Sequence, residues 1–81
     1  MDMDTPLDQL HPRQTAEIQS IRAERELSRR LYALGLRPGQ LIRVLRQGPL
    51  KGPLHVRVGH TDIMIRRQDA HRIQVRLAPQ I

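Results

Sequence analysis

The side chains best suited to bind a transition metal are imidazoles and nearby carboxylates, here His11, His55, His60, His71, Asp62 and Asp69. None of them stands in the HxxxH or HxH spacing that brings two ligands to one face of a helix or strand. His60 and Asp62 are two positions apart, so in a strand they share a face and offer two ligands to a transition-metal ion. Because two ligands make a weak and open site, we expect solvated histidines and no resident cofactor.

Catalytic constellations are missing from the sequence. There is no cysteine nucleophile, and neither Ser20 nor Ser28 stands in the GxSxG pattern of a nucleophile elbow. The GxxxxGK[ST] and GxGxxG motifs that cradle nucleotide phosphates are absent as well. Arg37 could contact a nucleotide held by a partner, but a solvated arginine beside a turn is the simpler interpretation. The sequence predicts a protein that is not an enzyme.

The composition points to a basic chain with few aromatic residues. Its 81 residues carry a formal charge of +6, from thirteen arginines and the single lysine Lys51, which suits an anionic partner or simply a basic solvated surface. Tyr32 is the only aromatic residue, so nucleic acid is disfavoured because the platforms that stack unpaired bases are lacking. Residues 1–5 contain two aspartates and no basic residue, and no apolar run reaches the roughly 20 residues that span a bilayer. We therefore expect a cytoplasmic chain that does not insert into a membrane but can be recruited to its inner face by a partner.

Hydrophobic periodicity divides the chain into five strands and one helix. Alternating or β-favouring apolar residues predict strands at 15–22, 40–46, 54–58, 61–66 and 73–77. Leucines spaced four and three positions apart predict an amphipathic helix over 23–34, which Gly35 closes in a left-handed conformation.

Turn signals define the segments between these elements. Pro38 and Gly39 predict a type II turn, and residues 48–53 hold four glycines and prolines, which makes them a shaped loop. Residues 1–13 form a lead-in with a mobile tip, anchored by Leu7 and Leu10. The resulting fold class is mainly β: a small, SH3-like, partly open barrel of about five strands, with one helix between the first two strands.

Four segments carry a resemblance to a known family. Residues 31–39 read LYALGLRPG, which resembles the LxxLGxxPG signature of FeoA (ferrous iron transport protein A) domains. The loop 48–53 reads GPLKGP and is similar to the PLGxP-like segment of that family. Residues 63–70 read IMIRRQDA, a strand that ends in basic residues before an acidic one, and 73–75 match the last strand.

The resemblance covers residues 14–77 in the order and spacing of the family, and Lys51 departs from it where the family often has glycine. It implies a domain at 14–81 with an SH3-like fold, which acts as a non-enzymatic accessory protein of bacterial ferrous iron uptake. The implied partner is the cytoplasmic domain of an FeoB-type ferrous iron permease. The same domain resembles the C-terminal module of iron-dependent repressors, but no DNA-binding domain is attached here, so a partner-binding role is favoured.

The residues expected to contact such a partner are apolar and basic side chains near exposed turns, namely Leu31, Leu36, Arg37, Pro49, Leu50 and Lys51. Leu36, after the helix, and Leu50, between prolines and glycines, are the two apolar side chains that we expect to be exposed. An equal alternative for Leu50 is that it caps the mouth of the barrel. Leu27, Leu31 and Leu34 are expected in the core more than at an interface.

Two other functions stay open. An RNA-associated barrel would use a positive patch, formed if His55 and Arg57 of one strand lie beside the polar residues Arg72, Gln74 and Arg76 of the last strand. A transition-metal-sensing module would use the His60 and Asp62 pair. The exposed strand edges of an open barrel also favour a homodimer.

Overall fold

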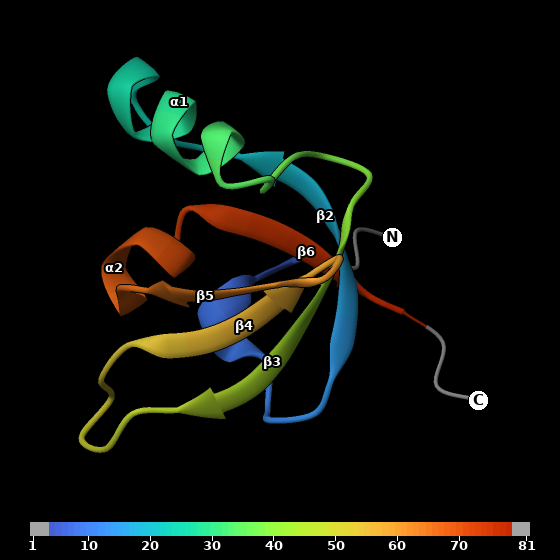
Figure 1. The fold of residues 1–81 in the computed structure, drawn as a ribbon, viewed down its shortest axis with the longest axis vertical. Coiled ribbons are helices and arrows are strands. Elements are labelled where there is room, and N and C mark those ends of the chain that lie inside the picture. The colour runs from blue at the N-terminus through green and yellow to red at the C-terminus, as the bar shows by residue number, and fades with distance from the viewer. Residues whose placement is uncertain (1–3, 79–81) are drawn as a thin grey trace.

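Six antiparallel strands form the sheet, in the order β1-β6-β2-β3-β4-β5 (Figure 1). The strands are β1 (Thr5–Pro6), β2 (Thr15–Ile21), β3 (Leu41–Gln47), β4 (Leu54–Val58), β5 (Thr61–Ile65) and β6 (Ile73–Leu77). The helical elements are α1 (Arg25–Ala33), the single-turn α2 (Arg67–Ala70) and the 3₁₀ turn η1 (Leu7–Gln9). This computed structural model describes residues 4–78. The prediction of a small, mainly β, partly open fold is confirmed.

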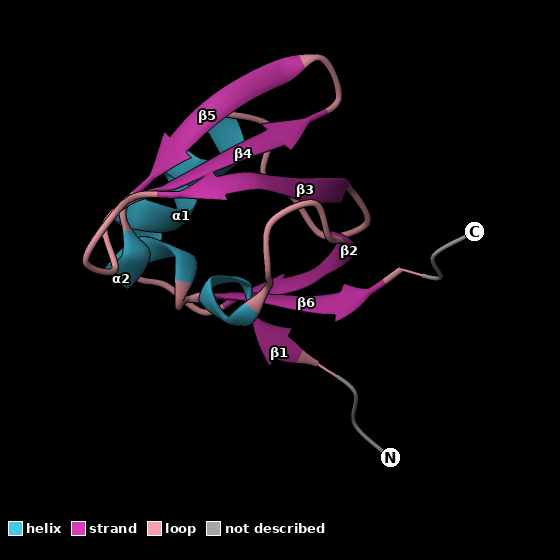
Figure 2. Cartoon of the chain, turned by 90° about the horizontal axis from the view of Figure 1, so that it is seen from below, coloured by secondary structure: helices cyan, strands magenta, loops and turns pink. Residues whose placement is uncertain are grey.

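The sheet curls on itself (Figure 2), and the apolar side chains of its strands form one core cluster. Alternate residues of β2, β3, β4 and β6 point inward, and Ile18, Val44, Val56 and Val75 are among the most deeply buried. β3 bends where its pairing with β4 shifts register between Val44 and Arg46, as expected for a strand of a tiny barrel.

The N-terminal lead-in contributes to the sheet and to the core. β1, which the sequence did not predict, pairs with β6 through Thr5 opposite Val75. Leu7 and Leu10, the predicted anchors, are both buried. The predicted mobile tip falls on residues outside the described range. Among the residues that the structure describes, no helix is long and apolar enough to cross a membrane.

The end of α1 is a complete Schellman motif. Gly35 has a φ of +94°, and its N–H donates to the Tyr32 carbonyl at 2.9 Å. The Leu36 N–H donates to the Leu31 carbonyl at 3.0 Å, the long-range bond of this motif. Gly39 follows with a φ of +94° in the predicted turn, so both glycines take the conformation that the sequence required of them. The helix has no side-chain cap at its start, where Glu24 precedes Arg25.

Candidate docking surface

The loop between β3 and β4 holds the most exposed leucine of the described residues. It projects from the lower left of the sheet (Figure 1), and Leu50 at its tip is 99% exposed. The Gly48 N–H donates to the Pro53 carbonyl at 2.8 Å, which closes the base of the loop. The predicted exposure of Leu50 is confirmed, and the alternative in which it caps the barrel mouth is wrong.

Two consecutive left-handed residues shape the tip of this loop. Leu50 and Lys51 each have a φ of +57°, and the Gly52 N–H donates to the Pro49 carbonyl at 3.0 Å. Positive φ at both central residues is the geometry of the type I′ hairpin turn, which normally selects Asn-Gly. Side chains other than glycine occupy it at an energetic cost, so the surrounding contacts must hold the loop in place.

Arg67 of α2 supplies such contacts. Its Nε donates to the Lys51 carbonyl at 3.0 Å, and its Nη1 donates to the Asp8 carbonyl at 3.2 Å. One guanidinium therefore ties the loop to α2 and to η1, three segments far apart in the sequence. The sequence did not predict that Arg67 holds the loop. The only indication in it was that Arg67 is the second of two consecutive arginines after a strand.

The other predicted docking leucines lie in the core. Leu36 is 0% exposed, so the prediction that it is an exposed apolar contact is wrong. The physical reason is the Schellman motif, which commonly brings the residue after the closing glycine against the last turn of the helix, where Leu31 is also buried. Arg37 and Pro49 are exposed. Of the predicted contacts, the structure leaves Pro49, Leu50 and Lys51 adjacent on one exposed turn.

The apolar face of α1 is only partly covered. Leu31 belongs to the core and Leu27 packs against it, as predicted. Leu34 is 48% exposed, so its expected place in the core is wrong. Leu34 and the exposed Met64 line a groove between α1 and the end of β5.

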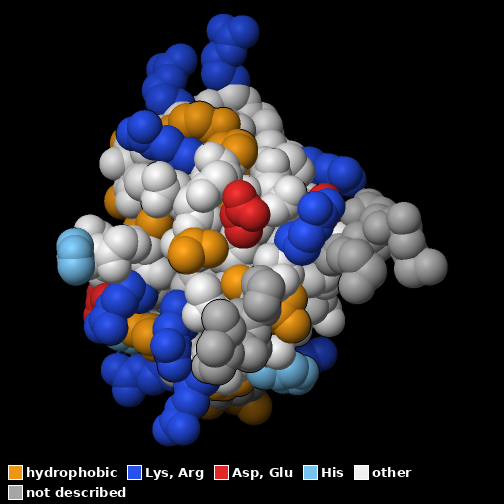
Figure 3. Space-filling model, turned by 90° about the vertical axis from the view of Figure 1, so that its right-hand side faces the viewer, with side chains coloured by type: hydrophobic (Ala, Val, Ile, Leu, Met, Phe, Trp, Pro, Cys, Tyr) orange, Lys and Arg blue, Asp and Glu red, His pale blue; other side chains and the backbone are white. Residues whose placement is uncertain are grey.

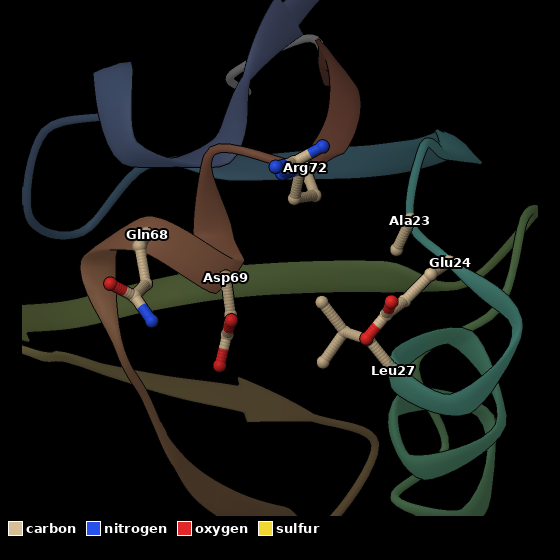
Figure 4. Close-up of a pocket in the computed structure, with 6 residues that line it drawn as sticks. All are labelled: Ala23, Glu24, Leu27, Gln68, Asp69 and Arg72. Atoms are coloured by element: carbon tan, nitrogen blue, oxygen red, sulfur yellow. The ribbon is translucent and has the colours of Figure 1, made fainter.

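A second cavity lies between the start of α1 and α2, with a volume of about 510 Å³ (Figure 4). Glu24 and Leu27 reach into it from the α1 side, and Asp69 points into the same space from α2. Arg72 lines it too, so one positive charge accompanies the two carboxylates. No motif in the sequence indicated this cavity, because its lining comes from two helices that meet only in the folded chain.

The candidate metal ligands His60 and Asp62 have different surroundings. His60 lies in the turn before β5, and Asp62 is instead engaged by Arg57, whose Nε and Nη2 donate to it at 2.7 and 3.2 Å. The hydrogen bond from Arg57 lowers the pKa of the Asp62 carboxyl. The imidazole nearest Asp62 is that of His55, at 3.4 Å. Over residues 4–78, no three histidines or carboxylates gather in a way that could hold a metal ion.

The predicted positive patch is not formed by neighbouring strands. β4, with His55 and Arg57, lies between β3 and β5, whereas β6, which holds Arg76 and follows Arg72, lies between β1 and β2. The condition for the patch, that these strands lie side by side, is therefore not met, because β6 pairs with β1 and β2. Figure 3 shows Lys and Arg side chains spread around the edge of one face rather than gathered in a single stripe.

The family profile described as the FeoA domain matches residues 5–77. The chain belongs to the FeoA family. The FeoA protein of Chlorobium tepidum is 35% identical over 93% of this chain and 71% of that one, with a TM-score of 0.87. An iron uptake regulatory protein, FeoA, is 30% identical over 95% of this chain and 100% of that one, with a TM-score of 0.83.

A third FeoA structure adds a description of the fold. The FeoA of Stenotrophomonas maltophilia, complexed with zinc, is described as a prokaryotic SH3 domain protein and a candidate ferrous iron transport activating factor. It is 32% identical over 88% of each chain, with a TM-score of 0.77. The predicted FeoA resemblance and SH3-like fold are thus confirmed. The sequence has no significant match among curated proteins.

Proposed function

We propose that this FeoA-family chain is a non-enzymatic accessory protein of ferrous iron uptake. It acts in the cytoplasm by docking on the cytoplasmic domain of an FeoB-type permease. Family membership supports the pathway, and the names of two FeoA relatives refer to iron uptake and to ferrous iron transport.

The observation that carries the docking role is the exposure of Leu50. Burial of an apolar side chain that is 99% exposed stabilises the protein only when a partner covers it. The turn with two left-handed residues places this side chain away from the core. Pro49 and Lys51 extend the same surface. Leu31 and Leu36 are excluded from the residues proposed to contact the permease, because both are buried.

A tagged pull-down from nuclease-treated, gently solubilised membranes of the native host tests this function. The captured proteins are identified by mass spectrometry at physiological salt. We expect enrichment of the ferrous iron permease with the wild-type chain and its loss with Leu50→Ser. Leu41→Ser, which changes another exposed leucine at the start of β3, is the matched control and should retain capture. Recovery of RNA-binding proteins without the permease would contradict the proposal.

A further inference from the structure

We propose that the Leu50 tip and the pocket beside it bind a protein segment that carries a carboxylate next to an apolar side chain. This inference rests on the proposed docking function and specifies the chemistry of the segment that is bound. The pocket has a volume of about 480 Å³ and lies between η1 and the β3–β4 loop. Asp8, His11, Gln47, Lys51 and Arg67 are among the residues that line it.

The positive charges of this pocket have no anionic partner among the described residues. Arg67 donates to two backbone carbonyls, which are neutral acceptors and leave its charge in place. Lys51 is exposed and forms no ion pair in the part of the chain that the structure describes. Two cations that line one pocket and form no ion pair favour an anion there.

Asp8 is the one carboxylate among the residues that line the pocket. The Asp8 side chain is only 11% exposed, and its Oδ1 lies 3.3 Å from the Nδ1 of His71. The lining therefore holds two cations against one carboxylate, which leaves it with a net positive charge. A carboxylate from a partner would find Lys51 and Arg67 available.

The loop combines this charge with a preorganised apolar contact. Leu50 precedes Lys51 directly, and both residues keep left-handed conformations while Arg67 holds the Lys51 carbonyl. A partner therefore need not order the loop before binding, which removes one cost of association. Arg67 thus serves both parts of the surface, because it fixes the tip and lines the pocket.

A protein segment suits this surface better than a lipid membrane. Membrane recruitment by charge usually takes a cluster of about four to eight basic residues with a larger apolar face. Here one leucine projects beside a concave pocket whose lining includes only two cations, Lys51 and Arg67. A surface that combines one apolar tip with one local anion site suits a short peptide segment that carries an acidic side chain next to an apolar one.

The test measures the affinity of the full chain for the purified cytoplasmic domain of the host permease by isothermal titration calorimetry. The informative variant is Lys51→Glu, which reverses the charge but leaves the bond from Arg67 to the Lys51 backbone in place. We expect it to weaken binding at least tenfold. Arg25→Glu, on the exposed side of α1, changes the net charge equally and should change affinity less than twofold.

Equal effects of Lys51→Glu and Arg25→Glu would overturn the anion pocket, while a loss of binding in Leu50→Ser would still support the docking function. No effect of Leu50→Ser would instead overturn the docking function itself. A lipid ligand would give a different result: the wild-type chain would sediment with phosphatidylglycerol vesicles, Lys51→Glu would not, and neither would bind the permease domain. That result would assign the anion site to lipid and overturn the proposed protein segment.

Discussion

Leu36 and Leu50 have similar sequence surroundings, since each follows a glycine or a proline in a turn, yet they are 0% and 99% exposed. Replacing each leucine with alanine tests whether burial, rather than residue type, determines the loss of unfolding free energy. Leu36→Ala removes a fully buried side chain next to Leu31, and such changes cost about 2–5 kcal/mol of unfolding free energy. Leu50→Ala removes no packed contact and should stay within about 0.5 kcal/mol of the wild type.

The expected loss is large for so small a domain. If Leu36→Ala costs about 3 kcal/mol, it removes about a quarter or more of a total stability of about 4–12 kcal/mol. A loss of 1 kcal/mol lowers Tm by about 4–8 °C at this chain length, so Tm should fall by about 12–24 °C.

Urea unfolding followed by far-UV circular dichroism measures both variants. Tryptophan fluorescence cannot be used, because the sequence has no tryptophan. A Leu36→Ala variant within 0.5 kcal/mol of the wild type, or a Leu50→Ala variant that is as destabilised as Leu36→Ala, would refute the burial argument.

Three further changes test the turn geometry and the surface charges. Gly35→Ala should cost about 1 kcal/mol or more in urea unfolding, because alanine is disfavoured at a φ of +94° although its Cβ would meet no atom within 4 Å; an unchanged midpoint would contradict this. Asp62→Asn should lower stability at pH 7 but not at a pH below the folded-state pKa of Asp62, because that pKa lies below its unfolded value of 3.8 and the ionised form stabilises the fold only above it. A difference that persists at low pH would exclude the ion pair with Arg57 as its cause. Arg43→Thr should raise Tm, because Arg43 of β3 stands directly opposite Arg57 of the neighbouring strand β4 and like charges in that position repel each other. A fall in Tm would show that this pair is not repulsive.

Local signals in the sequence predicted much of the fold. Gly35 and Gly39 both adopt the positive φ that helix closure and a type II turn require, because these conformations depend on a few consecutive residues. The hairpin of β4 and β5 follows from strict alternation on either side of a short turn. Four neighbouring glycines and prolines favoured an exposed Leu50 but left the capping of the barrel mouth as an equal alternative, and the structure shows the exposed form.

Features that depend on distant segments were missed. β1 has two residues and becomes a strand only because β6 lies beside it. The separation of β4 from β6 could not be derived from either strand, since both alternate in the same way. The wrong prediction that Leu36 is exposed did not depend on distant segments. A leucine after the closing glycine of a helix, five positions beyond Leu31, is itself a local signal for burial.

The position of β6 between β1 and β2 has a consequence for synthesis of the chain. Thr5 pairs with Val75, and Ile18 pairs with the same residue from the other side, so β1 and one edge of β2 find their hydrogen-bond partners only in the last part of the chain. A nascent chain that ends before residue 73 can form the β3–β4–β5 meander but leaves one edge of β2 unpaired. We infer that the domain completes its fold only after β6 has left the ribosome, and that the β1–β6 contact, with the longest loop to close, forms late.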